Sequence, residues 1–332
     1  MNYLDRLDPE LAACVRGLPE AVGFDFSNLP LMRELMQRVV AQFQASVACA
    51  ADVAIEEAAA PGRDGTPPVK VRVFRPPSGE DLLPAVLSIH GGGYVMGDLS
   101  SDDVLNGRIA SEVGCVVVGV EYRLAPEHPY PAPLEDCYAA MAWLFEHAPR
   151  LGVDPARIGL RGMSAGGGLA AALALLVRDR GEFSLCFQML DYPMLDDRHV
   201  TQSSRNDTDP RVWNATANRF GWRSYLGELA GQTDMPPYAV PARAACLAGL
   251  PPACLFIGSA DLFVDEVTEY ACRLNAAGVM TELHVYPGGF HGFELMLPQT
   301  ALARRFTADN LSALRRGLCA GTAPQLARHE ST

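Results

Sequence analysis

The segment Gly162-Met163-Ser164-Ala165-Gly166 has the residue types and spacing of an activated serine nucleophile. A short predicted strand at residues 157–161 precedes it, and an Ala- and Leu-rich predicted helix follows at once. A tight strand-to-helix turn strains the serine backbone and exposes its hydroxyl, and the helix N-terminus favours developing negative charge. Alone, the segment could also be a chance cluster of small residues that starts a helix.

Three consecutive glycines, Gly91 to Gly93, follow His90 and a predicted buried strand at residues 85–89. Glycines let backbone N–H groups approach a ligand closely. A tetrahedral acyl intermediate needs such donors for its oxyanion, and one donor is worth roughly a hundred- to a thousand-fold in rate. We expect Gly91 and Gly92 to donate together with Ala165. A flexible turn is the alternative, and a phosphate loop is disfavoured because no Gly-Lys-Ser/Thr sequence follows.

An acid and a base follow later in the chain. Asp261 comes just after a predicted strand at residues 254–257, and His291 lies on a glycine-rich loop after a predicted strand at 282–286. A serine hydroxyl needs a general base, and the base needs a carboxylate that fixes its tautomer. The order Ser164, Asp261, His291 is the order used by α/β-hydrolases.

Other acids compete with Asp261. Asp191 also ends a predicted strand and is the best alternative. Asp265 and Glu266 fall in the first turn of a predicted helix, where acids complement the helix dipole without any catalytic role.

Other histidines compete with His291. His284 falls in the middle of a predicted strand, and His128 lies in a Pro-rich loop. We expect His90 to help shape the glycine turn.

Short apolar runs alternate with predicted helices from about residue 84 onward. Strands buried on both faces look like this, as in parallel sheets covered by helices. The fold class is therefore α/β, a mostly parallel doubly wound sheet. A half-buried strand is expected at 69–74. The apolar runs are 85–89, 115–120, 158–160, 185–190 and 254–257, and the intervening helices are about 132–147, 165–180 and 262–277.

Two segments are predicted to form a helical cap. The first is residues 1–50, where Leu31, Leu35, Met36, Val39, Val40 and Phe43 form one apolar stripe. The second is an insertion at residues 196–240, in which Asp209-Pro210 resembles a helix start and Trp213, Phe220, Trp222 and Tyr225 follow. The α/β-hydrolase catalytic domain then comprises residues 51–195 and 241–320, with a tail at 321–332. A continuous second domain is the alternative.

Composition restricts the class of protein. The chain has 332 residues, 49% hydrophobic, and a formal net charge of −12, which disfavours nucleic acid as a partner. The first residues include early acids and no long apolar run, so no secretory signal is expected. Residues 169–177, the longest apolar run, are too few to cross a bilayer. Nine scattered cysteines indicate reduced thiols in a cytoplasmic protein, with a disulfide framework or a metal site as the alternative.

The sequence resembles the bacterial hormone-sensitive-lipase family of esterases (family IV) over about residues 69 to 297. The resemblance implies an α/β-hydrolase fold with a helical cap and the catalytic residues Ser164, Asp261 and His291. It implies oxyanion donors at Gly91, Gly92 and Ala165, no cofactor and no metal, and short- to medium-chain esters as substrates. Dimers are common in the family, so a homodimer is possible. The matching segments are His-Gly-Gly-Gly-Tyr-Val-Met-Gly at 90–97, Tyr-Arg-Leu-Ala-Pro-Glu-His-Pro-Tyr-Pro-Ala at 122–132, Leu-Glu-Asp-Cys-Tyr at 134–138, Asp-Pro at 154–155, Gly-Met-Ser-Ala-Gly-Gly at 162–167, Asp-Tyr-Pro-Met at 191–194, Asp-Leu-Phe-Val-Asp-Glu at 261–266 and His-Gly-Phe at 291–293.

Two positions depart from the family pattern. The family often has Gly-Asp-Ser-Ala-Gly, whereas Met163 stands at the aspartate position here. The hydrogen bonds of that aspartate must therefore be absent or replaced. An acid motif often written Asp-Pro-Leu-x-Asp-Glu has Leu262 in place of the proline.

The sequence therefore predicts a serine carboxylesterase. The candidate pocket residues are Tyr94, Tyr192, Trp213 and Phe263, although packing within the cap explains its aromatic residues equally well. Amide, formamide or lactone hydrolysis by the same triad is the alternative. A small-molecule receptor on the same fold is a remote one, since all three residues of the triad are present.

Overall fold

A single eight-stranded sheet forms the centre of the molecule. The computed structural model describes residues 2–18, 23–24, 26–46, 52–63, 65–77, 82–205 and 209–319. The strand order is β1-β2-β4-β3-β5-β6-β7-β8. β1 and β2 run antiparallel to their neighbours, and the remaining pairs are parallel. The strands are β1 (Ala54–Ala60), β2 (Val69–Arg75), β3 (Leu83–Ile89), β4 (Val116–Val120), β5 (Val153–Met163), β6 (Gln188–Asp191), β7 (Ala253–Gly258) and β8 (Thr281–Tyr286).

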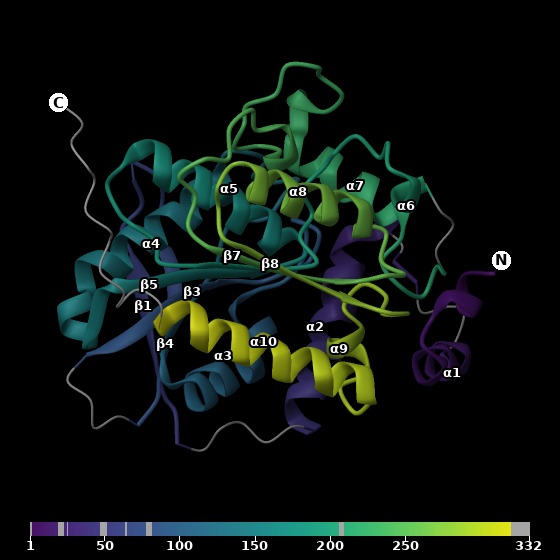
Figure 1. Cartoon of the computed structure of the whole chain (residues 1–332), viewed down its shortest axis with the longest axis horizontal. Helices are drawn as coiled ribbons and strands as arrows, with labels where there is room; N and C mark the ends of the chain where they lie inside the picture. The colour runs from purple at the N-terminus through teal and green to yellow at the C-terminus, as the bar shows by residue number, and fades with distance from the viewer. Residues whose placement is uncertain are drawn as a thin grey trace.

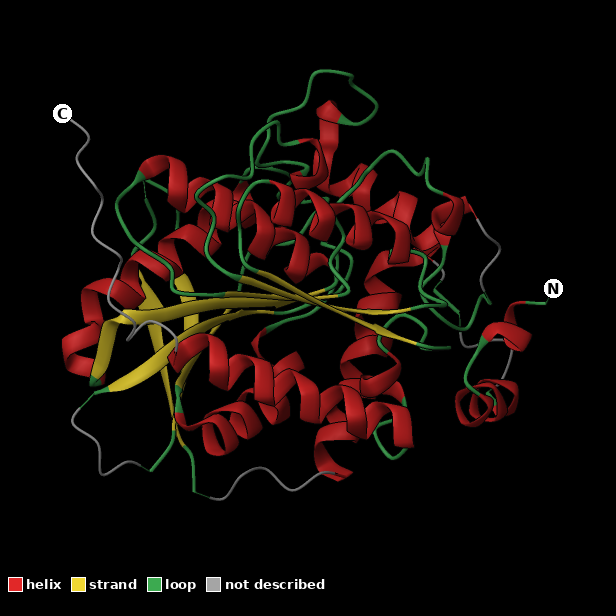
Figure 2. Ribbon diagram, in the orientation of Figure 1, coloured by secondary structure: helices red, strands yellow, loops and turns green. Residues whose placement is uncertain are grey.

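Helices cover both faces of this sheet. Figure 2 shows the strands as one layer between two layers of helices. In Figure 1, α4 (Ala132–Leu151), α5 (Ala165–Arg180) and α8 (Val264–Ala276) lie on one face, and α3 (Asp103–Ile109) and α10 (Ala301–Cys319) lie on the other. Every residue of β3, β4, β6 and β7 is buried, as continuous apolar runs require in a two-sided sheet. The predicted α/β-hydrolase fold is confirmed.

The sequence misplaced the start of one strand and missed another strand. β6 begins at Gln188, three residues after the start of the apolar run at 185–190. β1 was not predicted. Six of its seven residues are exposed or only partly buried, so it lacks the apolar signal of the central strands and is specified mainly by its antiparallel partner β2.

The helix predicted to begin at Asp209-Pro210 begins later. It is α7 (Ala215–Leu226), and the Asn214 side chain caps it by accepting hydrogen bonds from the Thr216 and Ala217 amides. The Asp209 carboxylate instead pairs with Arg211. Trp213 therefore precedes the helix, because the local cap at Asn214 and not the Asp-Pro pair sets the helix start.

The N-terminal segment is helical, as predicted, but three residues of its predicted apolar stripe are exposed, and the side chain of Phe43 lies outside the part of the chain that the structure describes. It contains α1 (Pro9–Gly17) and α2 (Leu29–Ser46). Leu31, Leu35 and Val39 are 49%, 43% and 55% exposed. α2 is held through a different face, on which Met32 is buried in the core and Leu29 and Met36 pack against it. In addition, the Arg33 guanidinium donates to backbone carbonyls of the catalytic domain and pairs with Glu127.

The N-terminal segment and the insertion contact each other. Phe26 stacks on Phe220 of α7, with ring centroids 4.7 Å apart, and the Arg211 guanidinium donates to the Leu18 carbonyl oxygen at 3.3 Å. We therefore propose that residues 1–50 and 196–240 together form the cap over the catalytic domain. The predicted tail at 321–332 lies outside the described residues. Among the described helices, none is long and apolar enough to cross a membrane.

Candidate active site

Ser164 stands in the turn between β5 and α5 with a strained backbone. Its φ is 56° and its ψ is −122°, in a region that residues with a Cβ rarely adopt. Its amide donates to the Asp191 carbonyl oxygen at 2.9 Å. A Cβ on Gly162 would lie 2.1 Å from the Gly166 carbonyl oxygen, so only glycine fits there. Close backbone contacts therefore hold the serine in its strained position.

The three predicted residues of the triad form one continuous chain of hydrogen bonds. The Ser164 Oγ lies 2.8 Å from the His291 Nε2, and the His291 Nδ1 lies 2.8 Å from the Asp261 Oδ2. The second oxygen of Asp261 accepts from the Phe263 amide at 2.9 Å. The Asp261 side chain is buried, and that of Ser164 is nearly so. This arrangement orients an imidazole to take a proton from a serine hydroxyl.

The competing acids are engaged elsewhere. Asp191 is buried under the nucleophile turn, where its carboxylate binds Arg161 at 3.0 Å and the Asn310 amide at 2.6 Å. Asp265 accepts from the Ser203 amide at 2.7 Å, and Glu266 accepts from the Leu195 amide at 2.9 Å. Burial raises the pKa of both Asp191 and Glu266. None of these carboxylates is bonded to His291.

The competing histidines also lie outside the triad. The His90 ring stacks on Tyr122 with centroids 4.2 Å apart, and its Nδ1 lies 2.8 Å from the Gly91 carbonyl oxygen. His284 on β8 pairs with Glu282, and His128 lies in the loop before α4. His90 therefore supports the glycine turn, as the sequence suggested.

The glycine turn lies directly against the nucleophile. A Cβ on Gly91 would lie 3.4 Å from the Ser164 Cβ. Gly92 follows with a φ of 118°, which favours glycine. Ala165 is the first residue of α5 and is fully buried. The backbone of these residues is thus placed at the nucleophile, where oxyanion donors are required.

Three of the four candidate pocket residues surround His291. The rings of Tyr192 and Phe263 meet the imidazole edge-on, with centroids 4.8 Å and 5.0 Å away. Trp213 lies 6.2 Å from it. Tyr94, the fourth, is buried behind the glycine turn and stacks on Tyr225 of α7 at 4.1 Å.

An aromatic cluster continues from Trp213 into the N-terminal segment. Phe24 and Phe26 pack edge-on against Trp213, with centroids 5.2 Å and 6.0 Å away. Sequence reasoning did not identify these two phenylalanines as site residues. They lie far from the motifs in sequence, and a single Phe-x-Phe pair carries no signal of its tertiary partner.

Glu294 is a second residue that sequence reasoning missed. It lies on α9 (Phe293–Met296), three residues after His291, and its carboxylate accepts a short hydrogen bond from the Tyr192 hydroxyl. Burial raises its pKa to about 8. The available signal was a lone acid inside the apolar run Phe293-Glu294-Leu295-Met296.

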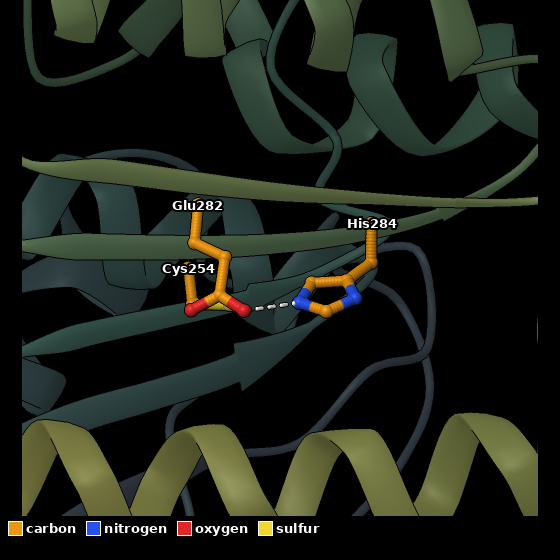
Figure 3. A group of neighbouring side chains, drawn as sticks. All are labelled: Cys254, Glu282 and His284. Atoms are coloured by element: carbon orange, nitrogen blue, oxygen red, sulfur yellow. Dashed lines mark hydrogen bonds and ion pairs between the residues drawn. The ribbon is translucent and has the colours of Figure 1, made fainter.

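Cys254, Glu282 and His284 form a separate cluster on β7 and β8. Their potential ligand atoms lie within 4.8 Å of one another, and Figure 3 shows the Glu282 carboxylate bonded to the His284 ring. Both carboxylate oxygens of Glu282 also accept from Arg316, at 2.9 Å and 2.8 Å. Burial raises the pKa of the Cys254 thiol, which disfavours the thiolate that a metal would need. We therefore assign no metal to this cluster.

A cavity of about 670 Å³ lies on the outer side of α7. None of the predicted site residues lines it. Its wall contains Arg198, Arg219, Arg223 and Arg243 together with His199 and Trp222. The Arg243 guanidinium is already paired with Asp197, and we give this cavity no role in the chemistry.

Comparisons with known proteins identify relatives of the chain. A family model described as the alpha/beta hydrolase fold matches residues 86–295. Carboxylesterase NlhH of Mycobacterium tuberculosis is 40% identical over 264 residues, covering 77% of this chain and 81% of that protein. Esterase LipI of the same species is 39% identical over 251 residues, covering 75% and 78%. The solved structure of a bacterial heroin esterase is 42% identical, covers 96% of this chain and 99% of its own, and has a TM-score of 0.91.

Proposed function

We propose that this chain, which belongs to the hormone-sensitive-lipase-like (family IV) esterases of the α/β-hydrolase fold, cleaves short- to medium-chain acyl esters through Ser164, His291 and Asp261. The chain is a carboxylic-ester hydrolase. The observation that carries this proposal is the continuous hydrogen-bond chain from the Ser164 hydroxyl through His291 to Asp261.

The first half of the reaction forms an acyl-enzyme. The Ser164 Oγ attacks the ester carbonyl carbon while the His291 Nε2 takes the hydroxyl proton. Asp261 holds the proton on Nδ1 and stabilises the imidazolium. The backbone N–H groups of Gly91, Gly92 and Ala165 stabilise the oxyanion. His291 then returns its proton to the leaving alcohol oxygen, and the carbon–oxygen bond to the alcohol breaks.

The second half releases the acid. Water attacks the acyl carbon while His291 takes one of its protons, and collapse of the second tetrahedral intermediate returns that proton to the Ser164 Oγ. The carboxylic acid leaves, and the free serine is regenerated. Every proton passes through His291, so no cofactor is required.

The preference for short to medium acyl chains is supported by the aromatic residues near the base. The rings of Trp213 and Phe263 both lie next to His291. Phe24 and Phe26 pack edge-on against Trp213. Rigid aromatic walls limit the length of an acyl chain next to the nucleophile. We propose that Trp213 sets this limit.

The same triad would also attack amides, formamides and lactones. These substrates share the tetrahedral intermediate, so the pocket and not the triad selects among them. The carboxylesterase and esterase relatives make esters the preferred class. A receptor function is disfavoured because all three triad residues lie within hydrogen-bond distance of one another.

The test is hydrolysis of p-nitrophenyl esters from acetate to decanoate, with Ser164→Ala and a matched p-nitroanilide series alongside. We expect turnover to peak between acetate and hexanoate, to be far slower on anilides, and to fall by up to about a million-fold in the variant. Undiminished activity in Ser164→Ala would refute the assignment of the nucleophile. Faster anilide than ester turnover would refute the substrate class.

A further inference from the structure

Tyr192 occupies an unusual position beneath the triad. It directly follows β6, and its φ is 36°, a value that is rare for a bulky residue. Its amide donates to the Phe256 carbonyl oxygen at 2.7 Å, and its side chain is buried. At the far end of the ring, the hydroxyl donates to the Glu294 Oε1. The hydrogen bond of Glu294 therefore links two segments: the loop that contains His291 and the end of β6.

The Tyr192 ring is one wall of the space that holds the imidazole. Its edge meets His291 at a centroid distance of 4.8 Å and an interplanar angle of 70°. The imidazole must keep both nitrogens 2.8 Å from their partners, so a small tilt would lengthen one bond or the other. A tyrosine that shifts would thus disturb the contact between Ser164 and its base.

The Tyr192 hydroxyl also lies next to the nucleophile turn. The Met163 Sδ is 3.7 Å from it. In methionine the Sδ is two bonds beyond the Cβ, as the carboxylate oxygens are in aspartate. An aspartate at position 163, which related sequences often have, would bring an acceptor oxygen to the same hydroxyl. A methionine sulfur is only a weak acceptor, so with Met163 in place the buried hydroxyl needs a stronger acceptor from elsewhere.

We propose that Glu294 is a positioning residue that fixes Tyr192 against His291. Its carboxyl accepts the hydrogen bond that an aspartate at position 163 would accept. The inference rests on the proposed triad. Glu294 is buried, and in the described chain its second carboxyl oxygen has no hydrogen-bond partner. Among the described residues, Tyr192 is therefore the one side chain that forms a hydrogen bond with this carboxyl. The carboxyl is thus dedicated to holding the tyrosine.

The first test removes the acceptor and then restores it in place. Glu294→Leu is expected to lower kcat for p-nitrophenyl butyrate about 10- to 100-fold while KM changes less than threefold, because displacement of a catalytic group slows chemistry more than it weakens binding. Glu294→Gln keeps an acceptor oxygen and is expected to stay within about fivefold of the wild type. Leu295→Ala, on an exposed side chain of the same helix, is the matched control and should be unchanged.

The second test moves the acceptor to the nucleophile turn. Met163→Asp in the Glu294→Leu background is expected to restore kcat at least fivefold, whereas a merely structural role for Glu294 on α9 would not be rescued by a residue at the end of β5. A folded double variant with no recovery would overturn the equivalence of the two positions.

Tyr192→Phe keeps the inference testable if Glu294→Leu does not fold. It removes the hydroxyl and leaves the ring, and we expect kcat to fall about 5- to 50-fold. Adding Glu294→Gln to it should cost little more, because the two side chains act as one unit. Wild-type kcat in folded Tyr192→Phe would overturn the inference. If Ser164→Ala also kept full activity, the proposed triad itself would be wrong.

Discussion

The strand-end region and the proposed cap are held together by different kinds of contact. At the strand ends, Ser164, Asp261 and His291 are held by directional hydrogen bonds of 2.8 to 2.9 Å and by a strained backbone. In the cap, Trp213 is held by aromatic rings at 5.2 to 6.0 Å. Directional bonds fail when a partner is lost, whereas ring packing tolerates adjustment.

From this difference we expect the strand-end region to determine the rate and the proposed cap to determine the selectivity among acyl lengths. Substitutions at the strand ends should lower kcat for every acyl length alike. Substitutions in the cap should change the ranking of acyl lengths at a smaller cost in rate. A cap substitution that abolished turnover for all substrates would break the comparison.

Among the substitutions at Asp261, Gly93, Trp213 and Glu294, Asp261→Asn should have the largest effect. Loss of the carboxylate leaves His291 in the wrong tautomer, and kcat should fall by about 10⁴-fold at neutral pH, equally for acetate and hexanoate esters. Steady-state kinetics across the ester series measures this. Asp265→Asn is the matched control, since its side chain can still accept from Ser203. A variant that keeps a tenth of wild-type kcat would contradict the role of Asp261.

Gly93→Ala tests the contact between the two regions, where the glycine turn meets Trp213. A Cβ there would lie 2.3 Å from the Trp213 ring, at a φ of +61°. The ring and the glycine turn cannot both keep their positions, so kcat/KM should fall about 10- to 100-fold. Gly181→Ala is the control: its φ is +66°, but nothing lies within 4 Å of the added Cβ, so it should reduce stability without reducing kcat. Equal kinetic losses in both variants would show that backbone strain alone is responsible.

Trp213→Ala should change selectivity more than rate. Removing the ring opens space beside His291, and each methylene accommodated in an apolar pocket is worth roughly tenfold or more in specificity. We expect the ratio of kcat/KM for octanoate over acetate to rise about tenfold, and Trp213→Phe to give an intermediate ratio. An unchanged ratio in folded variants would remove Trp213 from the acyl pocket.

The two regions should also respond to pH in opposite directions. Burial raises the pKa of Glu294 to about 8, so the folded state binds its proton more tightly than the unfolded state, and the free energy of unfolding falls as pH rises toward 8. Burial lowers the pKa of His199, in the proposed cap, to about 4. The free energy of unfolding therefore rises through His199 as pH increases from about 4 to 6.5. The groups facing Glu294 that oppose or favour its charge are Asp191, Arg161 and Tyr192.

Urea unfolding at pH 6 and pH 8 measures the Glu294 contribution. The free energy of unfolding of the wild type should fall by about 2 kcal/mol more than that of Glu294→Gln over this interval. Parallel pH dependence of the two proteins would show that Glu294 does not titrate in this range.

The strand-end region was largely predictable because its signals are local. Each triad residue directly follows a strand or lies in a glycine-rich turn, so Ser164, Asp261 and His291 could be named before their contacts were known. The central strands were predictable for the same reason, since burial on both faces leaves a continuous apolar run.

The cap was less predictable because tertiary contacts decide it. Leu31, Leu35 and Val39 are exposed although their periodicity suits a buried face. The helix is held by the buried Met32 and by the hydrogen bonds of Arg33 instead. Glu294 was missed because its partner, Tyr192, is about a hundred residues away in sequence. The possible homodimer, the exclusion of nucleic acid and the cytoplasmic location stay predictions.

Covalent trapping tests the central claim most directly. Diethyl p-nitrophenyl phosphate phosphorylates an activated serine, so the inhibited protein should carry one adduct per chain, located on Ser164 by peptide mass spectrometry, with esterase activity lost in proportion to labelling. Asp261→Asn should label far more slowly, and Ser164→Ala should not label there at all. Loss of activity with the adduct on another residue, or full activity in a protein labelled completely at Ser164, would contradict the account.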